Sequence, residues 1–591
     1  MYTGPQLIEL LEKQHRNRQQ SDLFKTGTFT LQWRAKVGSF PHPDVETIVS
    51  AGEPCGSWKP ELDCPANLSL PEEKRKVDEN LQYFNKLPLN GYIPGSVIRG
   101  LVRSWAKQRP AIHPKMLQLL GYQDDDTIQA GKIEFLDAWP EQPQKLTLDI
   151  VNPQQEFQVY HSQDIQSKPL SFYTLGNGVD KIPVTVAIRG IPGKANAAEV
   201  AEVWAWVQQA LTLYGVGSRT ASGYGAIASP DISKPILDPN YAVKTFDFTL
   251  YSQGCYGADS PRPGHSGEVE LRPSHWRGWL RSWVLRFLLG VMSEESVKKT
   301  LGELLGTIVD GEDNKSYKGC VRSQMTKGEI WGKKSNNQPY FYTWKGQLSL
   351  SAPSDILNQI ILPIVRFAVT VGGVGRGWRR PLHIFENDDN YSAGRGTHLT
   401  LTHRVKKKDT NDVKTITFAL SLNPTEWTKN YDNWRTAVQN RWSSRVLSGY
   451  NNSIAEVFSP ESCAIYLVPK PVEEPLNFDK LKWNTDRPDA KPRPTDTRGE
   501  GVNLIYQPRY KRKIEVGGNA AAKGGNSNCS WVTIKRVNIH NLKEDTDCQE
   551  IVCLFMGGQT PLSTHLRADF LKDLAKIYGA VHIFGVQPPS S

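Results

Sequence analysis

The residues best suited to chemistry in this chain are arginines that recur at the same spacing in two places. The pattern Arg-Gly-x-x-Arg-Ser-Trp begins at Arg99 and again at Arg277, so a second arginine follows four positions later, at Arg103 and at Arg281. Side chains four residues apart lie on the same face of a helix. Guanidinium groups bind phosphate well. Each copy therefore predicts a helix with a basic face toward an anionic chain.

The start of the first helix strengthens this prediction. Ser96 is the expected N-cap, and Lys107 extends the row of cations by one more turn. An open helix N-terminus presents unpaired N–H groups and a positive dipole end to phosphate. The alternative is a solvated basic face on a helix that packs by its apolar side. Because the pattern occurs twice, we favour phosphate binding.

A glycine-rich turn follows each Arg-Gly helix and is a second candidate contact with phosphate. The turns are YGVGSRTASGYG, residues 214–225, and GGVGRGWRRPLH, residues 372–383. Glycines allow a backbone to approach a sugar–phosphate chain closely, and a tryptophan among arginines could stack on a base. An ordinary tight turn between a helix and a strand is the alternative. The candidate residues are Gly215, Gly217, Ser218 and Arg219 in the first turn and Gly373, Gly375, Arg376, Trp378, Arg379 and Arg380 in the second.

The order helix, turn, helix, turn indicates a tandem duplication of one fold. A strand-like segment opens each half, at residues 28–38 and 244–254. A second apolar helix then leads directly into each glycine turn and a closing strand. Strand, helix, strands, helix, strand is the ferredoxin-like order. We therefore predict an α+β protein with two tandem ferredoxin-like (RRM-like) domains built on antiparallel sheets.

The same features predict the domain boundaries. We expect an N-terminal helix at residues 1–24, a first domain at 25–232, a second domain at 233–470, and a C-terminal linker and extension at 471–591. The basic stretch at residues 403–420 predicts a hairpin with lysines near its tip, and residues 506–513 (YQPRYKRK) mix aromatic and basic side chains. Either stretch could contact nucleic acid, and solvated loops are the equal alternative.

Composition favours some classes of protein and disfavours others. The 591 residues are 38% hydrophobic and carry a formal net charge of +10, which favours folded domains with an anionic partner. The eight cysteines are scattered without a Cys-x-x-Cys pair, so we expect reduced thiols, no zinc site and a cytoplasmic location. No apolar run approaches the roughly 20 residues of a membrane-spanning helix, so we expect no membrane partner.

IPGSVIRGLVRSW, followed far downstream by YGVGSRTASGYGAI, resembles the RAMP superfamily of CRISPR-associated proteins. The resemblance covers roughly residues 25–470. It implies two fused RAMP domains of the Cas-seven type in a type III effector, and the fusion resembles that of the III-D variant. Such a complex is a ribonucleoprotein of antiviral defence. The implied partners are guide crRNA, complementary target RNA and other effector subunits in a hetero-oligomer.

The resemblance also implies a site for cleaving target RNA. Family members that cleave use an aspartate in the loop after the first strand, together with a divalent metal. A carboxylate there could hold Mg²⁺, or another divalent cation, against the oxygens of an in-line displacement. The matching residues, as catalytic groups and metal ligands, are Asp259 in the second half and Asp44 in the first, with Asp63 as an alternative. A lone loop aspartate is otherwise a turn residue.

Two other functions remain open beside a metal-dependent endoribonuclease. One is a metal-independent crRNA-processing ribonuclease, which commonly uses a histidine as general base. The available histidines are His42, His161, His265 and His275. The other is a non-catalytic RNA-binding scaffold. A chelator should stop metal-dependent target cleavage, should leave processing intact, and should change nothing in a scaffold.

Overall fold

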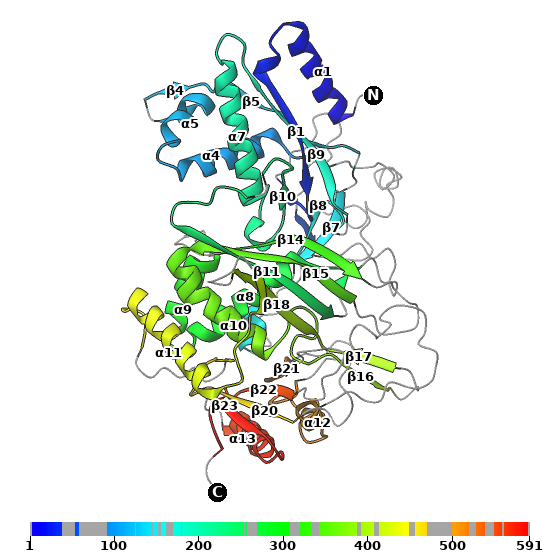
Figure 1. Ribbon diagram of the computed structural model, residues 1–591, viewed down its shortest axis with the longest axis vertical. Coiled ribbons are helices and arrows are strands. Elements are labelled where there is room, and N and C mark those ends of the chain that lie inside the picture. Colours follow the sequence, from blue (N-terminus) through cyan, green and yellow to red (C-terminus); the bar gives the residue numbers. More distant parts are fainter. Residues whose placement is uncertain are drawn as a thin grey trace, which may run out of the picture.

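The computed structural model describes residues 3–37, 54–57, 91–124, 126–142, 144, 146–151, 155–160, 170–178, 180–232, 234–252, 255–256, 269–307, 319–331, 342–386, 392–406, 413–447, 455–469, 499–518, 528–537, 549–557 and 561–588. The molecule is elongated, with the N-terminal elements at one end and the C-terminal elements at the other (Figure 1). Three antiparallel sheets follow one another along its length, each with its own helices.

The first unit contains the sheet β10-β1-β9-β5. Its helices α4 and α7 pack together over one face and bury a core that includes Leu31, Trp105 and Val207. An asparagine capping box at Asn196 begins α7, and Gly215, at φ 73°, ends it. The bounds are β1 (Phe24–Leu31), α4 (Gly95–Lys107), β5 (Ile133–Phe135), β9 (Ile182–Gly190), α7 (Ala197–Tyr214) and β10 (Ile227–Ala228).

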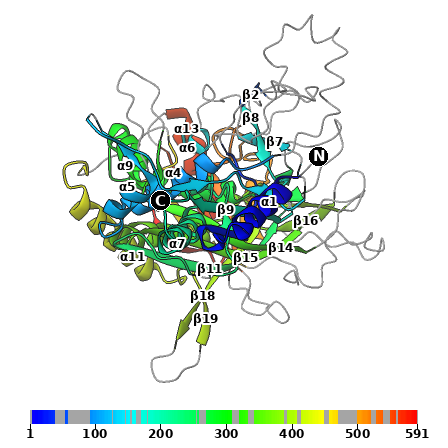
Figure 2. The ribbon, with the colours of Figure 1, turned by 90° about the horizontal axis from the view of Figure 1, so that it is seen from above.

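The second unit contains the sheet β14-β15-β11-β18-β19. Long alternating strands and three tryptophans of one helix build its core. The predicted hairpin at residues 403–420 is confirmed as β18 and β19, which extend away from the body of the molecule (Figure 2). The bounds are β11 (Tyr241–Ser252), α8 (Pro273–Leu288), α9 (Glu294–Leu305), β14 (Arg322–Trp331), β15 (Tyr342–Pro353), the π-helical η4 (Ile356–Ile361), α10 (Leu362–Val371), β18 (His398–Lys406), β19 (Val413–Thr417) and α11 (Pro424–Arg441).

The third unit was not predicted as a sheet of its own. Its strands form the order β21-β22-β20-β23, and β20 lies in the segment expected to end the second domain although it pairs with β22 and β23. The pairing of an apolar strand depends on its partner strands, and the sequence of β20 alone does not indicate which strands these are. The bounds are β20 (Cys463–Val468), α12 (Glu500–Ile505), β21 (Val532–Val537), β22 (Gln549–Phe555), α13 (Pro561–Ala575) and β23 (Val581–Gly585).

All three sheets share one strand order. If four strands of each unit are numbered along the chain, their neighbours in space run fourth, first, third, second: β10-β1-β9-β5, β18-β11-β15-β14 and β23-β20-β22-β21. The first unit adds β6 (Trp139–Pro140), which pairs with β9, and the second adds β19 at one edge. The molecule is thus a mixed α and antiparallel β protein in which one strand order occurs three times.

The third sheet is covered on both faces. In β20, Cys463, Ile465 and Leu467 pack into the core of the second unit, whereas Ala464 and Tyr466 pack with α12 and α13. Side chains alternate between the faces of a strand, so one strand serves two cores. Contacts of α10 with β21 and of α11 with β23 complete this junction.

Smaller elements lie around the three units. Helix α1 rests on the first sheet, where Ile8 packs with Phe24 and Ala187. No helix in the described ranges is both long and apolar enough to span a membrane. The remaining bounds are α1 (Gly4–Asn17), η1 (Ser21–Leu23), β2 (Pro54–Ser57), α5 (His113–Leu120), β3 (Tyr122–Gln123), β4 (Ile128–Gln129), β6 (Trp139–Pro140), β7 (Leu146–Val151), α6 (Gln155–Tyr160), β8 (Leu170–Leu175), η3 (Thr220–Ser222), β12 (Cys255–Tyr256), β13 (Val269–Glu270), β16 (His383–Glu386) and β17 (Ser392–Arg395).

Candidate nucleic-acid interface

The N-terminus of the first Arg-Gly helix is occupied by a carboxylate. Helix α4 begins at Gly95, and its N-cap is Pro94 rather than the expected Ser96. The Gly95 amide donates a hydrogen bond of 2.8 Å to Oδ1 of Asp137. A carboxylate at this position satisfies the helix dipole and repels phosphate. The predictions of a Ser96 cap and an open, anion-binding terminus are therefore wrong for α4.

The arginines of α4 reach the end of the next helix. Arg99 donates a hydrogen bond of 2.5 Å to the carbonyl of Leu120, the last residue of α5, and Arg103 donates to the carbonyl of Gly121. The last carbonyls of a helix lack partners within it, and cations near them are favourable. Gly121, at φ 75°, ends α5 in a conformation that favours glycine. Both arginines thus cap α5, whereas Lys107 is exposed.

The second Arg-Gly helix repeats this arrangement with deeper burial. Arg277 donates 2.7 Å hydrogen bonds to the carbonyls of Leu305 and Val321, and Arg281 donates one of 2.9 Å to the carbonyl of Gly306. Leu305 and Gly306 end α9 as Leu120 and Gly121 end α5.

The burial of Arg277 contradicts its expected outward position. Arg277 is only 7% exposed. Burial, with a smaller contribution from Arg281, lowers the pKa of Arg277 to about 9. The expected open basic face is wrong for Arg277, which is buried. The guanidinium groups of Arg99, Arg103 and Arg281 also donate to helix-end carbonyls, although Arg99 is exposed and the other two are half-buried.

The first glycine turn packs against the segment that follows the first strand. The amide of Ser218 donates a hydrogen bond of 2.7 Å to the carbonyl of Lys36. A Cβ on Gly217, at φ 84°, would lie 2.2 Å from that same carbonyl oxygen, so glycine is required there. Ser218 and Arg219 are exposed on this turn, and Arg219 adopts a left-handed conformation with φ 59°. The turn brings these two predicted side chains to the surface together.

The second glycine turn has the same backbone pattern. Val374 is buried as Val216 is, and Gly375 has φ 79°. Arg376 is exposed. Arg376 and Gly375 line a recess together with Ser252, His275 and several apolar side chains. Burial, helped by the charge of Arg272, lowers the pKa of His275 to about 3. His275 is therefore neutral near pH 7.

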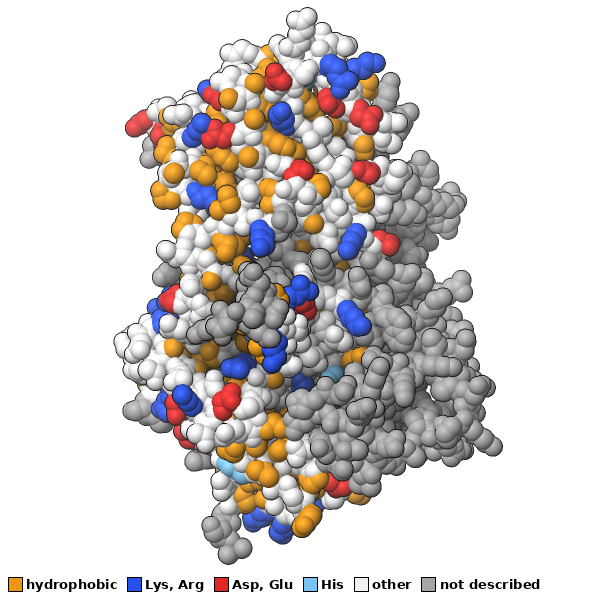
Figure 3. All heavy atoms as spheres, in the orientation of Figure 1, with side chains coloured by type: hydrophobic (Ala, Val, Ile, Leu, Met, Phe, Trp, Pro, Cys, Tyr) orange, Lys and Arg blue, Asp and Glu red, His pale blue; other side chains and the backbone are white. Residues whose placement is uncertain are grey.

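Exposed cations also lie on the second sheet. One of them, Lys345, was not predicted from the sequence. Lys345 of β15 and Lys414 of β19 are exposed, and the side chain of Arg404 of β18 is 73% exposed. Lys and Arg side chains gather over the middle of the face shown in Figure 3, where Figure 1 places the second sheet. The alternation of Lys345 with buried Trp344 and Leu348 was the signal that could have placed Lys345 on the outer face.

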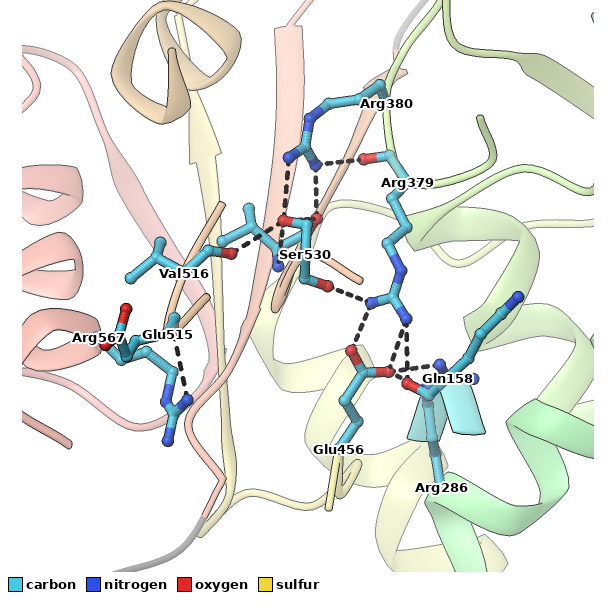
Figure 4. Close-up of polar contacts among 10 residues, drawn as sticks. Gln158, Arg286, Arg379, Arg380, Glu456, Glu515, Val516, Ser530 and Arg567 are labelled. Atoms are coloured by element: carbon cyan, nitrogen blue, oxygen red, sulfur yellow. Dashed lines mark hydrogen bonds and ion pairs between the residues drawn. The ribbon is translucent and has the colours of Figure 1, made fainter. Parts of the chain in front are cut away.

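Arg379 and Arg380 join the second unit to the third instead of facing solvent. Arg379 donates hydrogen bonds to the Ser530 carbonyl at 2.5 Å and to Glu456 Oε2 at 3.1 Å, and Arg380 donates to the Val532 carbonyl at 2.7 Å (Figure 4). Partners from residues beyond 450 occupy both guanidinium groups, so the structure gives no support to the predicted phosphate contact of these two residues.

Trp378 is committed to the same junction. The guanidinium carbon of Arg379 lies 4.5 Å from the centre of the Trp378 ring, and the ring of Trp283 makes an edge contact at 6.0 Å. Trp378 packs against the core of the second unit and is only partly exposed. The prediction that it stacks on a base does not fit a ring with these protein partners. Gly373 is likewise buried, where a Cβ would meet Thr397.

A buried network of charges fixes the first unit against the second. Arg34 pairs with Glu270 at 3.3 Å, and Arg272 pairs with Asp149 at 2.6 Å and with Glu270 at 2.5 Å. Tyr224, within the first glycine turn, donates to Asp149 at 2.5 Å. Because Glu270 and Arg272 precede α8, the network ties the first turn to the start of the second Arg-Gly helix.

The candidate catalytic residues cannot be placed. Asp44, Asp63 and Asp259, with His42, His161 and His265, lie outside the described residues. Within the described residues, no group of three His, Cys, Asp or Glu side chains is arranged to hold a metal ion. The first loop nevertheless begins just after Lys36, beside the first glycine turn, and the second ends at β13, beside the recess of the second turn.

Comparison with known proteins finds one family. The model of the RAMP superfamily matches residues 74–228, a range that includes α4 and the first glycine turn. No curated protein matches the chain. Among solved structures, a chain of the type III-B Cmr-beta complex bound to cognate target RNA is 16% identical with a TM-score of 0.23, over 38% of this chain and 65% of that one, slightly less than two thirds of its length. Cmr6 from Pyrococcus furiosus is 20% identical with a TM-score of 0.19, over 35% of this chain and 97% of that one. Scores this low do not establish a shared fold.

Proposed function

Since residues 74–228 are a segment of the RAMP superfamily, we propose that this chain is an RNA-binding subunit of a type III CRISPR effector complex. It would bind guide crRNA and complementary target RNA beside the other subunits of that ribonucleoprotein. The observation that carries the proposal is the repeated pairing of an Arg-Gly helix with a glycine turn. One pair, α4 with residues 214–225, lies within the family match, and the other, α8 with residues 372–383, lies beyond it.

The second pair supports a fusion of two Cas-seven-type domains. The first and second sheets have the same strand order, which supports the expectation of two ferredoxin-like domains. Arg99 and Arg277 also cap their neighbouring helices in the same way. Two residues in equivalent three-dimensional roles are stronger support for duplication than a shared motif alone.

The proposed RNA contacts are the candidates of the two glycine turns that face solvent. Ser218 and Arg219 of the first turn and Arg376 of the second offer donors to phosphate, and the glycines beside them leave room for the backbone of a nucleic acid. Lys345, Arg404 and Lys414 extend this positive surface over the second sheet. The four helix arginines instead hold α5 and α9 in place.

Cleavage of target RNA is the finer part of the proposal. We assign it to Asp259 and Asp44, which would hold Mg²⁺ or another divalent cation, with Asp63 as the alternative to Asp44. Carboxylate oxygens are the donors that Mg²⁺ prefers, so the donor type fits the metal. Bound there, the metal would stabilise charge on the phosphate during displacement. The carboxylates need a phosphate held nearby, and the glycine turns lie beside the described residues Lys36 and Glu270 that flank the two loops.

The test is to purify the complex from its host, sequence the bound RNA, and incubate it with matched target RNA with and without chelator. We expect crRNA in the complex and cleavage that stops with chelator. Asp259→Asn or Asp44→Asn should each remove one cut position without loss of assembly. Cleavage of precursor crRNA that survives chelator would instead identify a processing ribonuclease, and RNA binding without any cleavage would identify a scaffold. A complex without bound RNA overturns the proposal.

A further inference from the structure

The third unit carries a cluster of cations that the proposed function leaves unused. The turn after α12, residues 506–514, contains Arg509, Lys511, Arg512 and Lys513. All four are exposed. At the lower end of the face in Figure 3, over the elements of the third unit, Lys and Arg side chains are again visible.

One of these cations anchors the turn. Arg509 pairs with Asp569 of α13 and lies 3.7 Å from Asp573. The hydroxyl of buried Tyr510 donates a hydrogen bond of 2.5 Å to Asp573. These contacts use the two carboxylates of α13 and hold the turn on the helix. Lys511, Arg512 and Lys513 follow directly.

The three cations beyond the anchor have no acidic partner among the described residues. Three like charges in consecutive positions repel one another, and an anion brought to them relieves that repulsion. Arg512 moreover has φ 61°, a left-handed conformation that is unfavourable for a non-glycine residue. Arg219 of the first glycine turn shares this feature, with φ 59°. Each places an exposed guanidinium group at a position that glycine or asparagine would occupy with less strain.

The turn is also held at a fixed place relative to the second unit. The hydroxyl of Tyr506 lies 3.3 Å from Nε2 of His383 in β16. Arg380 and Arg379 bind the strand and loop at residues 530–532 of the same unit. A basic turn on a rigid support can add phosphate contacts at little cost in conformational entropy.

We propose that residues 511–513 bind the phosphate backbone of an RNA strand, as a contact site of the third unit separate from the two glycine turns. The inference rests on the proposed RNA-binding function and extends the contact surface from two units to three. Phosphate is favoured as the ligand because the turn offers several flexible cations and no built pocket for a particular base.

The test compares two variants that each lose three positive charges. The first carries Lys511→Gln, Arg512→Asn and Lys513→Gln, in which asparagine tolerates the left-handed backbone. The control carries Lys298→Gln, Lys299→Gln and Lys429→Gln on exposed positions of α9 and α11. The affinity of the intact protein for single-stranded RNA is measured over a range of salt concentrations.

For the first variant we expect the slope of log K against log salt to fall by about 2, since each lost phosphate contact removes about 0.7. The control should keep the wild-type slope. An unchanged slope in the first variant overturns the inference. This holds also if the substitutions cause a protein subunit to dissociate from the complex, because the inference concerns contact with RNA. Wild-type protein that binds no RNA refutes the proposed function itself. Crosslinking of wild-type protein to RNA, followed by peptide mapping, gives a readout without mutation, and absence of the 511–513 peptide counts against the site.

Discussion

Arg99 and Arg277 occupy equivalent places in two units of the chain: each donates a hydrogen bond to the last carbonyl of the helix that follows its own, Leu120 in one case and Leu305 in the other. Arg103 and Arg281 do the same for the glycine one residue further. The repeated Arg-Gly pattern therefore preserves a contact between helices. The arginine side chain is long enough to donate to carbonyls of the neighbouring helix, which a shorter cationic side chain would not reach.

Removing the buried arginine should destabilise the second unit. Arg277→Met leaves the carbonyls of Leu305 and Val321 without their donor, and loss of hydrogen bonds to a charged group costs on the order of 3 kcal/mol in total. We expect a lower midpoint of thermal unfolding, with a smaller decrease for exposed Arg99→Met. The salt dependence of RNA binding should not change in either variant. A reduced slope at full stability would show that the helix arginines contact RNA after all.

The exposed turn arginines should behave in the opposite way. Arg219→Ala combined with Arg376→Ala removes two proposed phosphate contacts, so the slope of log K against log salt should fall by about 1.4 for a single-stranded RNA. Both side chains are exposed, so thermal unfolding should remain close to that of the wild type. RNA binding with the wild-type slope would exclude the glycine turns as the main contact.

The junction between the second and third units should depend on one carboxylate. Glu456 is fully buried and pairs with both Arg286 and Arg379. Glu456→Gln leaves two guanidinium groups without a counter-charge, a change that typically costs about 3–5 kcal/mol. We expect faster amide hydrogen exchange in β20 and β21 and earlier proteolysis near residue 470. Exposed Glu461→Gln is the matched control and should change neither measurement.

The same junction should also make stability depend on pH. Burial lowers the pKa of Lys535 to about 7, while its ammonium donates to the carbonyls of Val369 and Leu399. An unfolded lysine keeps a pKa near 10.4, so between about pH 7 and pH 10 the unfolded chain binds more protons than the folded one. Stability attributable to Lys535 therefore rises with pH across this range, by at most about 1.4 kcal/mol per pH unit.

Lys535→Met removes this titration. The unfolding free energy of the variant minus that of the wild type should therefore fall as the pH rises from 7 to 9.5, measured by denaturant titration at matched ionic strength. A difference that stays constant over that range would mean that Lys535 titrates at its ordinary pKa in the folded protein.

Much of the local structure was predictable from the sequence. Both Arg-Gly helices and the hairpin at residues 403–420 follow from spacing and alternation, which act within a few neighbouring residues. The exposed Arg219 and Arg376 were also found in this way, because a glycine turn at the end of a helix places its next residues at the surface. Spacing and alternation did not predict where the side chains of Arg99 and Arg277 point.

The physical reason is that helical spacing determines only which side chains share a face. What stands opposite that face depends on segments far along the chain: the carbonyls of Leu120 and Leu305 come from the following helix, and the partners of Arg379 and Arg380 come from residues about 150 positions later. The third sheet escaped prediction for the same reason, since its strands are separated by long segments and only their pairing reveals the shared order. The sequence thus determined which elements form and which residues are charged, whereas the tertiary structure decided which of those charges are available to a partner.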